Sequence, residues 1–257
     1  MDKPARHEDF PKMTLGEHLE ELRRRIIYAL LGVALALAVA LALGRQLIEL
    51  IEYPYAVAMA RAGLKPQLAV LAISGGFTMW ATVALYAALV AASPWVFYQL
   101  WMFVAAGLHT HERRWIVWAV PFSAALFAGG AAFAVGVSIP AIGFFIEFDK
   151  WLPGVTPIIT LQDYVHFMAA LTATMGLVFQ MPLAVLVLAK TGLASMKGFN
   201  KYRRHVILAI SVFAAVFAPP DLLSMFLMGL PMWALYELGV VLAYFLVLRR
   251  ASADKSN

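Results

Sequence analysis

The chain has 257 residues, of which 63% are hydrophobic and only 14% are charged, and its mean hydropathy is +0.79. These proportions exclude an ordinary soluble domain, in which about half of the residues are apolar and about a quarter are charged. The absence of cysteine excludes disulfide scaffolds, cysteine zinc sites and thiol nucleophiles. The net charge of +5 is modest, so its distribution along the chain is more informative than its size.

Long apolar blocks predict an all-α membrane protein with one integral membrane domain, residues 1–257. A spanning helix needs about 20 mainly apolar residues, because the hydrocarbon layer is about 30 Å thick and each residue adds about 1.5 Å. The predicted spans are residues 26–43, 77–99, 115–139, 164–189, 205–218 and 222–248. The last two are divided by Pro219-Pro220-Asp221, because consecutive prolines break a helix and require a turn.

An amphipathic helix is predicted immediately before the first span, where leucines recur at helical spacing from Leu15. Its polar face carries Glu20 and Glu21, four residues before Arg24 and Arg25. Two interpretations remain open at this point. Either the glutamates pair with those arginines, at a gain of only tenths of a kcal/mol, or they are available to a ligand.

Basic residues are concentrated on one side of this topology. Of the 20 Lys and Arg residues, 16 fall in the segments 1–25, 100–114, 190–204 and 249–257. Because cytoplasmic loops carry an excess of Lys and Arg, both chain ends are predicted to face the cytoplasm. The positive charge thus indicates orientation, and we expect no nucleic-acid partner. The longest loop on the other side, residues 45–74, contains Pro54, at which we predict a turn.

Two polar residues lie inside predicted spans. Glu237 is near the middle of the last span, where an unpaired carboxylate costs several kcal/mol, so it needs a function or a buried partner. Gln180 precedes Pro182, which predicts a bend in the fourth span. The Gln180 amide could contact a partner helix or only stabilise internal packing, since hydrogen bonds between helices contribute about 1 kcal/mol.

Catalytic motifs are absent from the sequence, so we expect no enzyme, no cofactor and no metal site. No metalloprotease helix or phosphate-binding glycine loop occurs, and His109 and His111 lack further ligands. The main alternative is an ion-coupled transporter that uses Glu237 and Gln180. Such transporters usually contain two related halves with matching interrupted helices, and no internal repeat of this kind is visible.

Several ordered motifs together resemble the TatC family, the receptor subunits of the twin-arginine protein translocase. They are His18-Leu19-Glu20-Glu21-Leu22-Arg23, Ser93-Pro94 with Tyr98-Gln99-Leu100-Trp101-Met102-Phe103, His111-Glu112-Arg113-Arg114, Phe179-Gln180-Met181-Pro182, Lys201-Tyr202-Arg203-Arg204 and Pro219-Pro220-Asp221. The resemblance implies a cup-shaped bundle of six transmembrane helices in the cell inner membrane. It also implies export of folded proteins that carry twin-arginine signal peptides, driven by the proton-motive force in a multi-copy complex with single-span TatA/TatB-type partners.

The resemblance further implies that Glu21 and Glu112 bind the signal peptide. Their neighbourhood comprises Leu22, Arg23, Gln99, Trp101, Phe103 and Arg113. The chain departs from the family's usual pattern at Gln180, where glutamate is common, and also at Ala106 and Ala218, where proline and threonine are usual. An amide can donate and accept hydrogen bonds, but it does not titrate.

Overall fold

The computed structural model describes residues 15–106, 116–154, 158–190, 196–217 and 222–245. Its helices are α1 (Leu15–Ala42), α2 (Gly44–Arg61), α3 (Gly75–Ala106), α4 (Ile116–Trp151), α5 (Leu161–Val178), α6 (Met181–Lys190), α7 (Met196–Phe217) and α8 (Leu222–Ala243). The all-helical class predicted from the apolar blocks is therefore confirmed.

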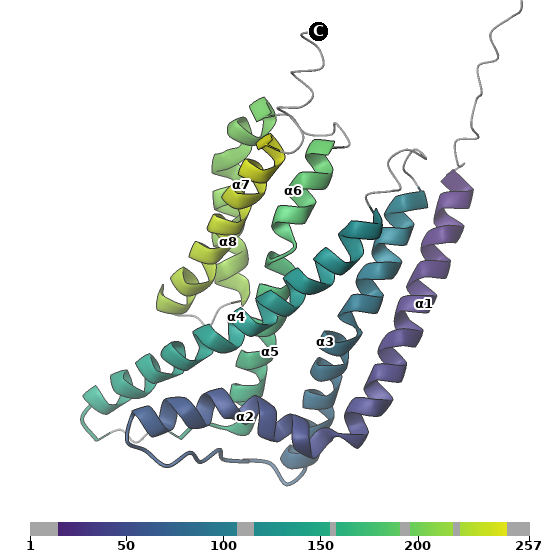
Figure 1. Cartoon of the computed structure of the whole chain (residues 1–257). Coiled ribbons are helices and arrows are strands. Elements are labelled where there is room, and N and C mark those ends of the chain that lie inside the picture. The colour runs from purple at the N-terminus through teal and green to yellow at the C-terminus, as the bar shows by residue number, and fades with distance from the viewer. Residues whose placement is uncertain (1–14, 107–115, 155–157, 191–195, 218–221, 246–257) are drawn as a thin grey trace, which may run out of the picture.

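The helices form two walls joined by an oblique helix (Figure 1). One wall consists of α1 and α3, which pack side by side, and the other consists of α5 to α8. Helix α4 crosses between them, and α2 lies across one end of the bundle. We call this the α2 end, and the opposite end, where α1, α4 and α7 begin, the basic end. This arrangement matches the predicted cup-shaped bundle.

Within the part of the chain that the structure describes, five helical stretches are long and apolar enough to cross a membrane. They are Gly16–Ala42, Gly75–Ala106, Trp118–Trp151, Leu161–Lys190 and Met225–Ala243. Helix α7, which contains the sixth predicted span, packs against α8 but is not among these five stretches. It begins nine residues before the predicted span 205–218, because the polar residues that precede the apolar block continue the same helix.

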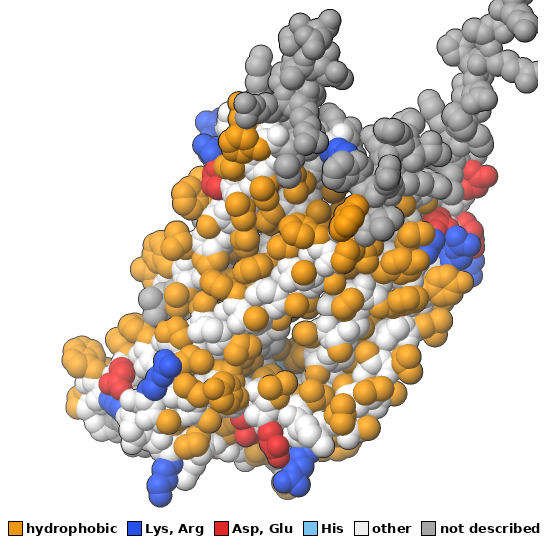
Figure 2. Space-filling view, viewed as in Figure 1, with side chains coloured by type: hydrophobic (Ala, Val, Ile, Leu, Met, Phe, Trp, Pro, Cys, Tyr) orange, Lys and Arg blue, Asp and Glu red, His pale blue; other side chains and the backbone are white. Residues whose placement is uncertain are grey.

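Large apolar side chains cover the outside of the bundle. Only 6% of the apolar window of α1 is buried inside the protein, and Leu31 and Leu35 are among its exposed side chains. On the visible face, hydrophobic side chains cover the flanks and charged side chains gather toward the two ends (Figure 2). Because lipid is as apolar as these side chains, the helices must be held together by close packing and polar contacts.

Close packing is most evident where α4 crosses α5. Gly130 lies against the backbone of α5, so that a Cβ atom at this position would lie 2.5 Å from the carbonyl oxygen of Met175. Gly176 lies against the ring of Phe127 in the same way. Two glycines therefore allow the two helices to approach each other more closely than larger residues would permit.

The prediction of a turn at Pro54 was wrong, because Pro54 is buried inside the continuous helix α2. Proline removes one helical hydrogen bond, but tertiary packing keeps the helix intact. The following residue, Tyr55, is buried in the core beneath α2, and its hydroxyl donates to the Gln67 carbonyl at 2.8 Å.

On α2, burial and the charge of Glu49 raise the pKa of Glu52, so this carboxyl retains a proton more readily than an exposed one.

Two interruptions occur near the predicted positions. Between α5 and α6 the helix breaks at Phe179 and Gln180, and Pro182 then lies in the first turn of α6, where a missing N–H costs little. Helix α7 ends at Phe217 and α8 begins at Leu222. Pro219, Pro220 and Asp221, for which a turn was predicted, lie outside the described residues.

Candidate functional site

Glu21 lies near the start of α1, at the basic end of the bundle. Arg24 and Arg25 follow it by three and four residues, so all three side chains lie on one helical face. The Arg25 Nε donates to Glu21 Oε1 at 2.6 Å, and the Arg24 Nη2 donates to Oε2. The side chain of Glu21 is only 10% exposed. Both of its oxygens therefore bind guanidinium groups through charge-assisted hydrogen bonds, the bond to Arg25 being partly buried and the bond to Arg24 exposed.

Gln99 connects this ion pair to α3. Its side chain is 3% exposed, and its Oε1 accepts a hydrogen bond from the Arg25 Nη1 at 3.1 Å. Arg25 thus bridges Glu21 on α1 and Gln99 on α3. Because a buried amide oxygen is costly to leave unpaired, the Arg25 contact stabilises Gln99 and joins the Glu21 ion pair to α3.

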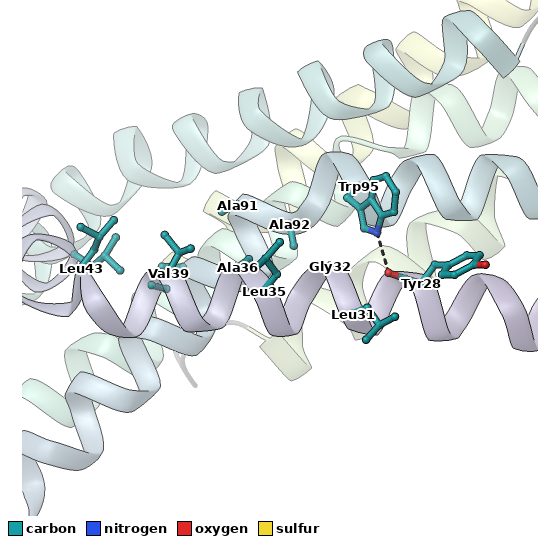
Figure 3. A pocket seen from close by; sticks show the side chains of 13 residues that line it. Tyr28, Leu31, Gly32, Leu35, Ala36, Val39, Leu43, Ala91, Ala92 and Trp95 are labelled. Carbon is teal, nitrogen blue, oxygen red and sulfur yellow. Dashed lines mark hydrogen bonds between the residues drawn. The ribbon is translucent and has the colours of Figure 1, made fainter.

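Trp95 fixes α1 against α3 one turn below this bridge (Figure 3). Its indole Nε1 donates to the Tyr28 carbonyl at 2.8 Å, and its ring lies against Gly32, where an added Cβ would be 2.2 Å from the ring. The contact closes one end of a groove of about 710 Å³ that continues between the two helices to Leu43. Trp95 therefore sets the register that brings Arg25 opposite Gln99.

Three further predicted residues lie on α1 and α3 near Glu21. The Phe103 ring stacks on His18 with centroids 4.5 Å apart, and Leu22 is half-buried. Arg23 is exposed and lies 3.9 Å from Glu20. An exposed pair of this kind contributes little to stability. The structure thus places Phe103 on the side of α3 that faces α1, and it leaves Arg23 open to solvent.

Trp101 occupies a different face of α3. It is buried in a cluster with Phe97 and Phe127, toward α4. Within the described part of the chain, its indole nitrogen has no hydrogen-bond partner. The structure therefore does not place Trp101 beside Glu21, because residues 99 and 101 point to opposite sides of the helix.

Glu112 and Arg113, the other predicted residues at this end, lie outside the described residues. They belong to the segment that joins α3 to α4. The described end of α3, Ala106, and the start of α4, Ile116, lie at the same end of the bundle as Glu21 (Figure 1).

Gln180 is bonded to its own chain at the α5–α6 break. Its Oε1 accepts from the Ser123 hydroxyl at 2.5 Å, and its Nε2 donates to the carbonyls of Ser123 at 3.0 Å and Gly176 at 3.5 Å. Ser123 is 1% exposed. The amide therefore links α4 to the break between α5 and α6, which agrees with the internal-packing interpretation. Contact of this residue with a partner helix stays a prediction.

Replacing Gln180 by leucine is expected to lower stability by about 1 kcal/mol, because the Ser123 hydroxyl would lose its acceptor and helix-to-helix hydrogen bonds have this magnitude. Thermal unfolding of the purified protein in detergent measures the effect. Ser123→Ala, which removes one of the three bonds, should have a smaller effect. Equal melting temperatures for Gln180→Leu and the unchanged protein would show that the network contributes nothing.

Glu237 on α8 forms an ion pair with Arg203 on the neighbouring helix α7. Its Oε2 accepts from the Arg203 Nη2, and the Glu237 side chain is 21% exposed. Arg203 belongs to the charged first half of α7, which begins at the basic end, and the depth of Glu237 in the membrane stays a prediction. The ion pair therefore joins α7 to α8 close to that end.

Sequence reasoning missed the bridge from Glu21 through Arg25 to Gln99. The i,i+4 spacing of Glu21 and Arg25 indicated a local pair, but Gln99 is 74 residues further along the chain than Arg25. Sequence reasoning also missed the contact of Trp95 with α1. Its role depends on Gly32 lying opposite it, and no local pattern in the sequence indicates that pairing.

These features define a multi-span helical membrane protein with a desolvated carboxylate at one basic end. The sequence matches the family of the Sec-independent protein translocase protein (TatC) over residues 17–231. A TatC protein of Deinococcus radiodurans is 33% identical over 244 residues, which cover 94% of this chain and 89% of that protein. A TatC protein of Frankia casuarinae is 34% identical over 242 residues, and the match spans 66% of its length.

The fold comparison agrees with the sequence comparison. A crystal structure of the twin-arginine translocase receptor TatC aligns with a TM-score of 0.77 and 26% sequence identity. The alignment covers 89% of this chain and 99% of that one. The chain belongs to the TatC family, as the ordered motifs indicated.

Proposed function

We propose that this chain is a receptor for twin-arginine signal peptides and that Glu21 and Glu112 are the carboxylates that bind the two arginines. The observation that carries the proposal is the position of Glu21, a largely buried carboxylate at an end of the bundle rich in basic residues. Family membership supports it, because the similar solved structure is that of a twin-arginine translocase receptor.

The chemistry of the site suits arginine better than lysine. A guanidinium group presents several N–H donors in a plane and can bind a carboxylate through two parallel hydrogen bonds. A lysine ammonium is a compact and strongly hydrated charge, which loses more solvation when it enters a partly buried site. Glu21 therefore favours guanidinium ligands, as its two bonds to Arg24 and Arg25 illustrate.

We place the basic end in the cytoplasm. The polar segments that precede α1, α4 and α7 and follow α8 hold most of the lysines and arginines, and the positive-inside rule assigns such segments to the cytoplasmic side. Both ends of the chain then face the cytoplasm, in the cell inner membrane. Signal peptides reach Glu21 from the compartment in which their cargo folds.

The transport step requires partners. We propose that the chain acts in a multi-copy complex with TatA/TatB-type single-span proteins and exports folded cargo by means of the proton-motive force, without enzymatic chemistry of its own. Gln180 cannot exchange a proton, so any titrating group of the complex lies elsewhere. The transporter alternative gains no support, because Gln180 and Glu237 are both engaged by neighbours within the chain.

Site-specific photocrosslinking tests the receptor proposal. A photoreactive amino acid at Leu22, next to Glu21, should crosslink a signal peptide with two arginines much more efficiently than the same peptide with two lysines. The same amino acid at Leu50, which is exposed on α2, is the matched control and should give no preference. Equal crosslinking of the two peptides at Leu22 would refute the proposed site.

A further inference from the structure

Glu21 already holds two consecutive arginines of its own chain. Arg25 binds one carboxylate oxygen and Arg24 binds the other. The proposed ligand of this carboxylate is also a pair of consecutive arginines. The free receptor therefore presents Glu21 with the same chemical groups that a signal peptide would bring.

The two arginines are held very differently. The Arg25 side chain is 16% exposed and is tied to Gln99 on α3 through its Nη1. The Arg24 side chain is 56% exposed and is bonded to Glu21 at one end of its guanidinium. Exposed ion pairs are weak, because solvent screens them and the long side chain loses conformational freedom. Arg24 is therefore the exchangeable partner, and Arg25 is the fixed one.

We propose that Arg24 is an internal stand-in for a signal-peptide arginine, and that a signal arginine displaces it from Glu21 Oε2 while Arg25 stays in place as a positioning residue. The proposal rests on the receptor function proposed above. Binding is then an exchange of one guanidinium for another on the same oxygen, and the displaced Arg24 turns toward solvent.

Exchange has a direct consequence for affinity. A signal arginine replaces the lost Arg24 bond with a bond of the same kind and adds its other contacts to the receptor. A lysine at the same position also has to displace Arg24 but has no planar fork, so it gains less than an arginine does. The cost of displacing Arg24 is the same for both, so the stand-in lowers both affinities by one factor, and the discrimination between arginine and lysine comes from the Glu21 carboxylate itself.

The test is the affinity of purified full-length receptor for a fluorescent signal peptide, measured by anisotropy with the twin-arginine and the twin-lysine forms. Arg24→Gln should tighten binding of the twin-arginine peptide about two- to fivefold, the range expected for release of an exposed ion pair. It should tighten binding of the twin-lysine peptide by the same factor, so that the ratio of the two affinities stays unchanged. Arg24→Lys should give values between those of Arg24→Gln and the unchanged receptor.

Two controls separate exchange from simple loss of positive charge. Arg204→Gln removes the same charge from an exposed position on α7 and should leave both affinities and their ratio unchanged. Arg25→Gln should act in the opposite direction to Arg24→Gln and weaken twin-arginine binding, because Glu21 loses its connection to Gln99. Weaker or unchanged twin-arginine binding by Arg24→Gln, or equal tightening by Arg204→Gln, would overturn the stand-in.

Failure of the underlying receptor function would give a different pattern. In that case the unchanged receptor would bind the twin-arginine and twin-lysine peptides equally, and charge reversal at Glu21 would have no effect. The stand-in alone is refuted when the unchanged receptor discriminates between the peptides but Arg24→Gln does not tighten binding of the twin-arginine peptide.

Discussion

Charge reversal of Glu21 to lysine is expected to abolish binding of twin-arginine signal peptides and export of a folded reporter. Removing one partner of a buried, hydrogen-bonded charge pair costs about 2–5 kcal/mol, which is at least about a 30-fold loss of affinity. Reversal adds repulsion, because the new lysine would face Arg24, Arg25 and the incoming arginines. Peptide anisotropy and export of a folded reporter measure the two effects.

The neighbouring residue supplies a matched control. Glu20→Lys makes the same change of charge one position earlier, but Glu20 is exposed and only 3.9 Å from Arg23 at its nearest approach. Glu20→Lys should reduce the affinity for the twin-arginine peptide at most a few-fold, since exposed ion pairs contribute about 1 kcal/mol or less. Normal export by a receptor in which both Glu21 and Glu112 are lysine would contradict the proposed site.

Replacing Gly130 by alanine is expected to destabilise the whole bundle by about 1–3 kcal/mol, the usual cost of forcing extra atoms into a packed interior. The new methyl group would lie 2.5 Å from the Met175 carbonyl oxygen, which is backbone and cannot rotate away. Helices α4 and α5 would have to separate. Thermal unfolding in detergent should show a melting temperature several degrees lower.

Gly129→Ala is the control for this packing prediction. A Cβ atom at Gly129 would make only ordinary contact, 3.8 Å from the ring of Phe179. Alanine is also the better helix former by about 0.5–1 kcal/mol. Gly129→Ala should therefore leave the melting temperature unchanged or raise it. Similar decreases for both substitutions would show that the close approach of α4 and α5 is not the cause.

Most of the fold could be predicted from the sequence because the bilayer imposes a strong constraint. A segment that crosses it must be helical, about 20 residues long and apolar, and such blocks are directly visible in the chain. The turn at Pro54 could not be judged in this way, because proline disfavours a helix locally, whereas the packing of α2 side chains such as Tyr55 maintains it. The same limit applies to Glu237, whose pairing with Arg203 on another helix is not indicated by any local pattern in the sequence.

The site was predictable in part. Glu21 was identified through motif resemblance, and its pairing with Arg25 followed from helical spacing. The Gln99 contact depends on how α1 packs on α3, which the Trp95 indole and Gly32 determine. Trp101 shows the opposite case, in which a residue close in sequence to Gln99 faces a different helix. Motifs indicate which residues to consider, whereas packing decides which of them meet.

A double-mutant cycle between Glu21→Gln in the receptor and arginine→glutamine in the signal peptide tests whether Glu21 contacts a signal arginine. Each of the two peptide arginines is replaced in turn, and the four dissociation constants of each cycle are measured by anisotropy. We expect a coupling free energy of at least about 1 kcal/mol with one of the arginines, as is usual for groups in direct contact. Additive effects, within about 0.5 kcal/mol in both cycles, would contradict recognition of the signal by Glu21.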